Sequence, residues 1–216
     1  MAGVSTLYRT IADRSYQCSI GVWATLSCQK SLRLKNIEFK LADAEALDFP
    51  ENSFDRILCS SALIWMADIP AALQLWRRLL KPGGILGFHA FAQTSFIAGI
   101  ASQKAAEKQG ISLTLNQPTG TREKCYNLLA VAGFEDIKIA IDRSESHYIP
   151  LEKAKSMWIG CDFPAPGQFP HPLAQLSPTQ LARVQADFFA ELEALNTDRG
   201  IWNDITIFYT FGSRSC

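Results

Sequence analysis

The sequence has no excess of one charge and no dense run of basic residues. Its 216 residues hold 21 Lys and Arg against 21 Asp and Glu, so the formal net charge is +0 at pH 7. A balanced chain has no general attraction for polyanions. We therefore expect no nucleic-acid partner and no binding to an acidic membrane surface.

The cysteines lack the spacing of a metal site or a redox pair. Six cysteines are scattered along the chain, with no Cys-x-x-Cys pair and no Cys/His cluster at zinc spacing. Cys59 and Cys125 lie in apolar periodic runs, which is typical of reduced core cysteines in a cytosolic protein. We expect no metal and a cytoplasmic location.

Long apolar runs are also missing, and none approaches the roughly 18 residues of a membrane span. The N-terminus has no basic region followed by an apolar core, so it does not look like a secretory signal. Hydrophobic residues nevertheless make up 48% of the chain, enough for one compact domain with a core and a small appended lobe.

What the chain does have is a regular alternation of strand and helix patterns from residue 36 onward. Asp68 predicts a helix start, and Lys81-Pro-Gly-Gly84 predicts its end, because proline cannot continue a helix. Such an alternation predicts an α/β domain with a mostly parallel sheet. Strands are expected at 36–41, 54–59, 85–91, 134–141 and 205–211, and helices at 68–80, 96–109, 121–132, 150–158 and 177–195.

The domain organisation follows from where this pattern holds. Residues 1–30 fit it poorly and form an atypical N-terminal segment, in which 16–26 suits a strand or a helix equally. Residues 31–216 form the α/β domain. Five of the ten prolines fall between 163 and 178, so we expect a helical and proline-rich cap at 145–200.

Ligands of an open parallel sheet bind beyond the carboxyl ends of its strands. The first predicted strand runs out into Asp43 and its neighbours, the second into Ser60 and Ser61, and the third into His89. We expect these three loops to converge on one site.

The residues around these loops resemble a known family. Leu41–Asp55 (LADAEALDFPENSFD) resembles the second conserved block of the type 11 class I methyltransferases, and Arg77–Gly84 (RRLLKPGG) resembles their block before the fifth strand. Ser60–Asp68 falls between them at the expected distance, and is closest to the matching segment of malonyl-carrier-protein methyltransferases. The three blocks in order are fairly specific. The resemblance implies a Rossmann-like methyltransferase sheet flanked by helices, and S-adenosylmethionine as cofactor.

The resemblance also implies a cofactor site. Asp43 matches the acidic residue that accepts a hydrogen bond from the adenine amino group, and Ala44 matches the neighbour whose backbone N–H meets an adenine ring nitrogen. Ser60 matches the position that borders the methionine part. The alternatives are that Asp43 caps a short helix beginning at Ala44, and that Ser60 only satisfies a strand end.

The chain departs from the family in its first part. The family opens with a strand, a glycine-rich loop, a helix and a second strand ending in an acidic residue, whereas this chain has only Gly3 and Gly21 before Asn36 and no acidic residue there after Asp13. The sequence therefore predicts a fold that lacks the usual first strands, with residues 1–30 filling their place in the sheet centre. We interpret this as a truncated gene, or a frameshift whose product is the segment 8–30, with exposed sheet edges that favour self-association.

Other side chains have both a functional and a structural interpretation. For His89, the two interpretations are a general base and a hydrogen-bonded residue at a strand end. For Trp65, they are a wall of an acceptor pocket and a core aromatic side chain. Three further aromatic residues have two interpretations: they form a lid together with the proline-rich loop, or they pack a helical lobe against the sheet. These residues are Tyr148, Trp158 and Trp202.

The sequence predicts an S-adenosylmethionine-dependent methyltransferase acting on a small-molecule acceptor, truncated or impaired at the glycine-rich loop. Positioning supplies much of the rate of an in-line methyl displacement, so no catalytic residue is assigned. The alternative is a non-catalytic methyltransferase-like protein that binds no cofactor.

Overall fold

The computed structural model describes residues 7–10, 16–19, 37–39, 42–158, 160–162, 165, 168 and 171–216. The chain divides into two compact units. The first comprises Met1–Ala90, Thr121–Ala140 and Phe208–Cys216, and the second comprises Phe91–Gly120 and Ile141–Ile207.

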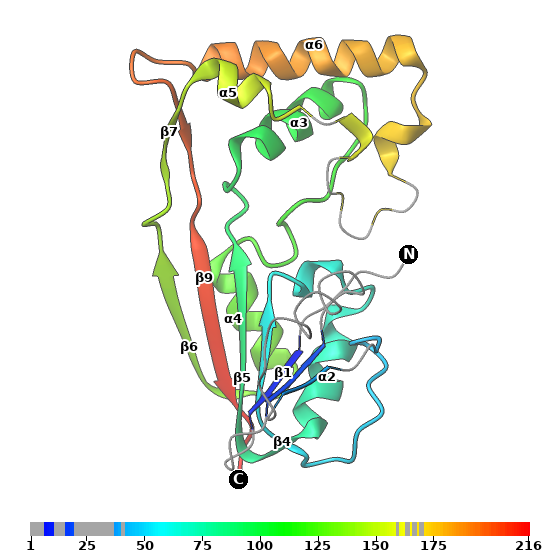
Figure 1. The fold of residues 1–216 in the computed structure, drawn as a ribbon, viewed down its shortest axis with the longest axis vertical. Coiled ribbons are helices and arrows are strands. Elements are labelled where there is room, and N and C mark those ends of the chain that lie inside the picture. The colour runs from blue at the N-terminus through cyan, green and yellow to red at the C-terminus, as the bar shows by residue number, and fades with distance from the viewer. Residues whose placement is uncertain are drawn as a thin grey trace. The chain divides into compact units, whose positions relative to one another are not determined.

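A sheet with the order β3-β2-β1-β4-β5-β9-β6 is the basis of the first unit (Figure 1). β4 pairs with β5 in parallel, with Ser60 opposite His89 in the register. The predicted strands are confirmed, although the last begins at 207 rather than 205. The strands are β1 (Leu7–Thr10), β2 (Tyr16–Ser19), β3 (Ile37–Phe39), β4 (Phe54–Ser60), β5 (Leu80–Phe91), β6 (Glu135–Asp142) and β9 (Ile207–Ser213).

The centre of the sheet shows what stands in the place of the family's usual first strands. β1 and β2 occupy the positions between β3 and β4, so the atypical N-terminal segment does fill this space. They are only four residues long and pair antiparallel, and β1 is also antiparallel to β4. A parallel arrangement needs a crossover of roughly a dozen residues or more, which the five positions between Thr10 and Tyr16 cannot supply. Of the ambiguous segment 16–26, Tyr16–Ser19 is strand and the remainder lies outside the described residues.

Helices α2 (Ile69–Leu79) and α4 (Arg122–Val131) contact each other in the first unit. Both begin as predicted, because the Asp68 carboxylate accepts the Ala71 N–H at 2.9 Å and the Thr121 hydroxyl accepts the Lys124 N–H at 3.1 Å. α2 buries Leu73, Trp76 and Leu79, which recur at helical spacing.

The Lys-Pro-Gly-Gly segment ends α2 as predicted but belongs to β5, which begins at Leu80 instead of 85. Leu80 pairs with Phe54, and the register then shifts before Arg56. Gly83 has a φ of 73°, and a Cβ on Gly84 would lie 2.8 Å from the Lys81 carbonyl oxygen. Both glycines are therefore needed for the backbone, as expected of a structural motif.

The second unit is mainly helical, and it contains the segment 145–200 for which a cap was predicted. α6 begins with the predicted capping box. The Ser177 hydroxyl accepts the Gln180 N–H, and the Gln180 side chain accepts the Ser177 N–H. α6 packs on α3 and α5 around an apolar cluster that includes Val184, Phe188 and Leu192 (Figure 1). The elements are α3 (Ile97–Lys108), β7 (His147–Ile149), α5 (Leu151–Lys155), η2 (Gly160–Asp162), η3 (Pro172–Gln175), α6 (Pro178–Leu195) and β8 (Ile201–Asn203), with β7 and β8 paired antiparallel.

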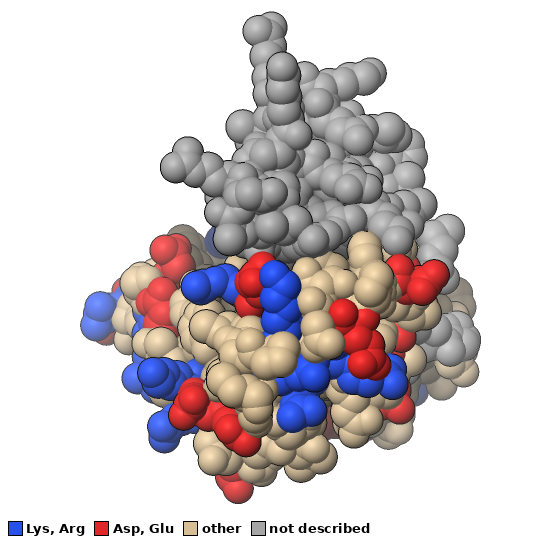
Figure 2. Space-filling model, turned by 90° about the horizontal axis from the view of Figure 1, so that it is seen from below, with Lys and Arg blue, Asp and Glu red and all other residues tan. Residues whose placement is uncertain are grey.

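Among the described residues, no helix has the length and apolar character needed to cross a membrane. On the face seen in Figure 2, Lys and Arg are interspersed with Asp and Glu over the described surface.

Candidate functional site

The carboxyl ends of β4 and β5 bring three predicted residues of the site together. Ser60 is the last residue of β4 and lies opposite His89 in the parallel register. The Ser60 hydroxyl is 3.3 Å from Nδ1 of His89, and the Ser61 hydroxyl contacts Nε2 of the same ring. The direction of each hydrogen bond depends on the imidazole tautomer. The convergence expected of three loops is thus present for those that follow β4 and β5.

His89 is half-buried, whereas both serines are exposed. Burial lowers the pKa of the imidazole below its usual 6.5. The ring also meets Tyr209 of β9 edge-on, with centroids 5.9 Å apart. A neutral imidazole between two hydroxyls can accept a proton from one side, which is the chemistry of a general base.

Ser61 sits in a backbone conformation that side chains seldom adopt, with a φ of 52°. The chain turns sharply here, from the end of β4 into the short 3-10 helix η1 (Leu63–Trp65). This turn directs the Ser61 hydroxyl to the His89 ring, a contact that the sequence pattern did not predict. Trp65, at the end of η1, is partly buried.

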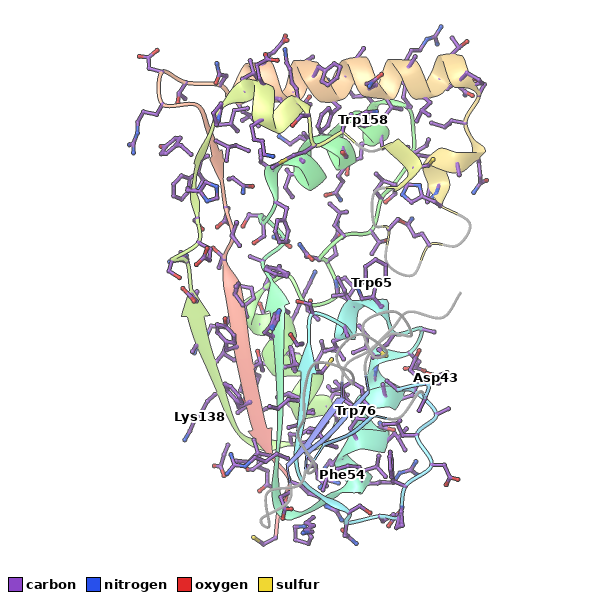
Figure 3. The ribbon with its side chains drawn as sticks, viewed as in Figure 1. Asp43, Phe54, Trp65, Trp76, Lys138 and Trp158 are labelled. Carbon is purple, nitrogen blue, oxygen red and sulfur yellow. The ribbon has the colours of Figure 1, made fainter. Side chains whose placement is uncertain are left out.

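Asp43 forms a local turn, not the start of a helix. Its carboxylate Oδ1 accepts the Glu45 N–H at 2.9 Å, and its carbonyl accepts the Ala46 N–H at 3.1 Å. The alternative in which Asp43 caps a helix beginning at Ala44 is therefore wrong. Asp43 is exposed, and Ala44 is buried beside it (Figure 3 labels Asp43).

The Asp43 turn is tied to α2 by two contacts that sequence reasoning missed. The buried Trp76 indole N–H donates to the Ala44 carbonyl at 2.8 Å (Figure 3 labels Trp76). The Glu45 carboxylate accepts the N–H groups of Ala67 and Asp68 at 3.0 and 2.8 Å. Neither contact has a local signal, because each partner lies more than 20 positions away in the sequence.

We expect Glu45→Gln to lower the free energy of unfolding by about 1–2 kcal/mol, because the amide can accept only one of the two N–H groups and loses the favourable charge near the start of α2. Urea denaturation followed by far-UV circular dichroism measures this. Glu51→Gln is the matched control, since Glu51 lies in the same connection and is exposed. Equal stabilities of the two variants would show that the Glu45 contacts do not hold the turn.

The remaining candidates lie in the second unit, where aromatic packing accounts for them. Tyr148 and Trp202 meet edge-on with centroids 5.0 Å apart, and the Trp158 ring lies 5.0 Å from that of Phe188. Both contacts join residues of the second unit. His147 is exposed.

Comparison with known proteins agrees with the fold. The model of the type 11 family, described as a methyltransferase domain, matches residues 13–88. This match covers about a third of the chain, and it is to this part that the likeness to the type 11 methyltransferases applies. The arginine-hydroxylase NDUFAF5 of Danio rerio is 33% identical over 110 residues, which cover 50% of this chain and 34% of that protein. The ubiquinone/menaquinone biosynthesis C-methyltransferase UbiE of Coxiella burnetii is 44% identical over 59 residues, covering 27% of this chain and 24% of that protein.

A solved structure supports the fold class. A Bacillus halodurans protein assigned as a methyltransferase matches with a TM-score of 0.51 at 13% identity, covering 89% of this chain and 78% of that chain. The predicted Rossmann-like methyltransferase sheet with flanking helices is confirmed. The part of this chain that matches NDUFAF5 covers about a third of the length of that protein.

Proposed function

We propose that this chain is a methyltransferase that uses S-adenosylmethionine and acts on a small-molecule acceptor. The observation that carries the proposal is the Asp43–Ala44 turn, together with the family match that surrounds it. The turn combines an exposed carboxylate with an adjacent backbone N–H, and Ala44 donates to no other described residue.

The chemistry of this turn suits the adenine part of the cofactor. Adenine offers an amino group that donates and ring nitrogens that accept, and the turn offers a carboxylate that accepts next to an N–H that donates. We propose that Asp43 binds the amino group, that Ala44 binds a ring nitrogen, and that Ser60 borders the methionine part. The cofactor supplies an electrophilic methyl group, so the protein's task is to position the two reactants.

A second function has specific support, namely a methyltransferase-like protein that binds no cofactor. The antiparallel β1–β2 pair stands where the family has a strand, a glycine-rich loop and a helix. Activities also vary among relatives, since NDUFAF5 is named an arginine-hydroxylase. The acceptor and the reaction of this chain are therefore proposals.

We also propose a reducing, cytoplasmic setting, although NDUFAF5 is named mitochondrial. Burial raises the pKa of the Cys59 thiol to about 12 and that of Cys125 to about 11, and neither is in a disulfide. Such thiols are unreactive core groups. Self-association of the chain is a further proposal.

Calorimetry with S-adenosylhomocysteine on the full chain tests the methyltransferase proposal. We expect binding, and we expect Asp43→Asn to weaken it about 10- to 100-fold, as for loss of a hydrogen bond to a charged group. Asparagine can still accept the Glu45 N–H and keep the turn, but its amide group meets the adenine amino group as a second donor.

The matched control is Asp48→Asn, which changes an exposed carboxylate five positions further along the same connection. Absence of binding to the unmodified chain at millimolar ligand would favour the cofactor-free alternative. Equal affinities of the Asp43 and Asp48 variants would show that adenine does not bind at this turn.

A further inference from the structure

The Ser60–His89–Ser61 cluster has a geometry that the binding of a cofactor does not require. Each ring nitrogen of His89 contacts a different hydroxyl, Nδ1 that of Ser60 and Nε2 that of Ser61. The imidazole is half-buried and the hydroxyls are exposed. A molecule at this edge of the sheet would therefore meet a hydroxyl first, with the imidazole behind it.

One of these contacts is maintained by a strained backbone. A residue other than glycine is strained in the left-handed region, and Ser61 adopts this region with a φ of 52°. Such strain clusters at functional sites. Here the strained residue is the one whose hydroxyl contacts Nε2 of His89.

The surroundings favour a neutral ring. Burial lowers the pKa of His89, which favours the uncharged imidazole at neutral pH. Its contacts include the uncharged serines from the end of β4 and the Tyr209 ring from β9. The tyrosine ring is partly exposed and offers an aromatic edge beside the hydroxyls.

We propose that His89 takes the proton of the methyl acceptor through a serine hydroxyl, and that the acceptor is a phenol or an enol that reacts at oxygen. This rests on the proposed methyltransferase function. The acceptor O–H passes its proton to a serine hydroxyl, which passes its own proton to His89. The acceptor oxygen forms the bond to the methyl carbon, and the electron pair of the broken S–CH₃ bond stays on the cofactor sulfur.

A histidine base is useful only for an acceptor that must lose a proton to react. A neutral amine already carries its nucleophilic lone pair, whereas a phenol or enol oxygen becomes a strong nucleophile on ionisation. General bases are most effective when the two pKa values are not far apart. The O–H of a phenol or an enol is closer in pKa to an imidazole than the O–H of an alcohol is, so it is better matched to a histidine base.

The test uses 4-nitrophenol, whose ionised form absorbs visible light, with the full chain and S-adenosylhomocysteine. We expect the phenol to ionise on binding, below the pH at which it ionises in solution, as its proton moves to His89. His89→Gln should abolish this absorbance, because the amide can still bond to both serines but cannot take a proton. His147→Gln, which alters an exposed histidine of the second unit, is the matched control and should leave the absorbance unchanged.

The second measurement is methyl transfer from S-adenosylmethionine to unsubstituted phenol, which stays protonated at neutral pH and therefore needs a base. We expect His89→Gln to lower kcat about 10²- to 10⁴-fold with little change in KM, and to remove the acidic limb of the pH profile of kcat/KM. No ionisation of the bound phenol by the unmodified chain, or equal signals and rates for the His89 and His147 variants, would overturn the inference.

Calorimetry with S-adenosylhomocysteine separates this result from the proposed function. If the chain and His89→Gln bind it equally while only the variant loses ionisation and rate, His89 acts on the acceptor proton. Loss of binding in the variant would instead make His89 part of the cofactor site and overturn the inference. Absence of binding by the unmodified chain would refute the methyltransferase proposal itself, and this inference with it.

Discussion

Replacing Trp76 with alanine is expected to lower the free energy of unfolding by about 3–5 kcal/mol, the usual cost of removing a fully buried tryptophan. Trp76 has 0% of its surface exposed, and its indole N–H is bonded to the Ala44 carbonyl. Net stabilities of natural domains are only about 5–15 kcal/mol. The change is therefore expected to leave the first unit marginally folded or unfolded, as judged by urea denaturation followed by circular dichroism.

Trp76→Phe separates the hydrogen bond from the packing. Phenylalanine keeps most of the apolar surface but leaves the Ala44 carbonyl without its donor, so we expect a loss of about 1–3 kcal/mol. The control is Trp202→Phe, because the Trp202 side chain is 48% exposed. If the two phenylalanine variants are equally stable, the Trp76–Ala44 bond does not stabilise the fold.

Gly200→Ala is expected to lower the stability of the second unit by about 2–5 kcal/mol, from two separate effects. Gly200 has a φ of 94°, where a side chain costs about 1–2 kcal/mol. A Cβ would also lie 2.5 Å from the Ile149 carbonyl oxygen, so the β7–β8 pair must move, and overpacking of this kind costs about 1–3 kcal/mol.

Gly110→Ala is the matched control for the steric part. Gly110 also has a positive φ, 74°, but no heavy atom lies within 4 Å of a Cβ built there. We expect this variant to lose only the backbone cost of about 1–2 kcal/mol in a thermal or urea unfolding experiment. If Gly200→Ala lowers the free energy of unfolding no more than Gly110→Ala does, the backbone near Ile149 moves aside at no cost in stability.

Local chemistry made the helices predictable. The start of α2 at Asp68 and of α6 at Ser177 follows from side chains that accept backbone N–H groups within three residues. The order of Leu73, Trp76 and Leu79 likewise shows which face of α2 is buried. These signals depend only on neighbouring residues.

Long-range contacts explain what sequence reasoning missed. The bond between Trp76 and Ala44, and those from Ala67 and Asp68 to Glu45, join segments that only the fold brings together. β1 had no signal of its own, since a four-residue strand gains its stability from its neighbours. For the site, the positions of Ser60 and His89 followed from their strand ends, but the turn at Ser61 did not.

The direction of β1 determines where the first part of the chain can reach the site. In the register, Leu7 lies opposite both Cys59 and Ser19, so the start of β1 and the end of β2 lie beside the carboxyl end of β4. The other ends of this pair, Thr10 and Tyr16, lie away from the carboxyl end of β4. The pair therefore presents its Leu7 and Ser19 ends to the side of the sheet where Ser60 and His89 meet.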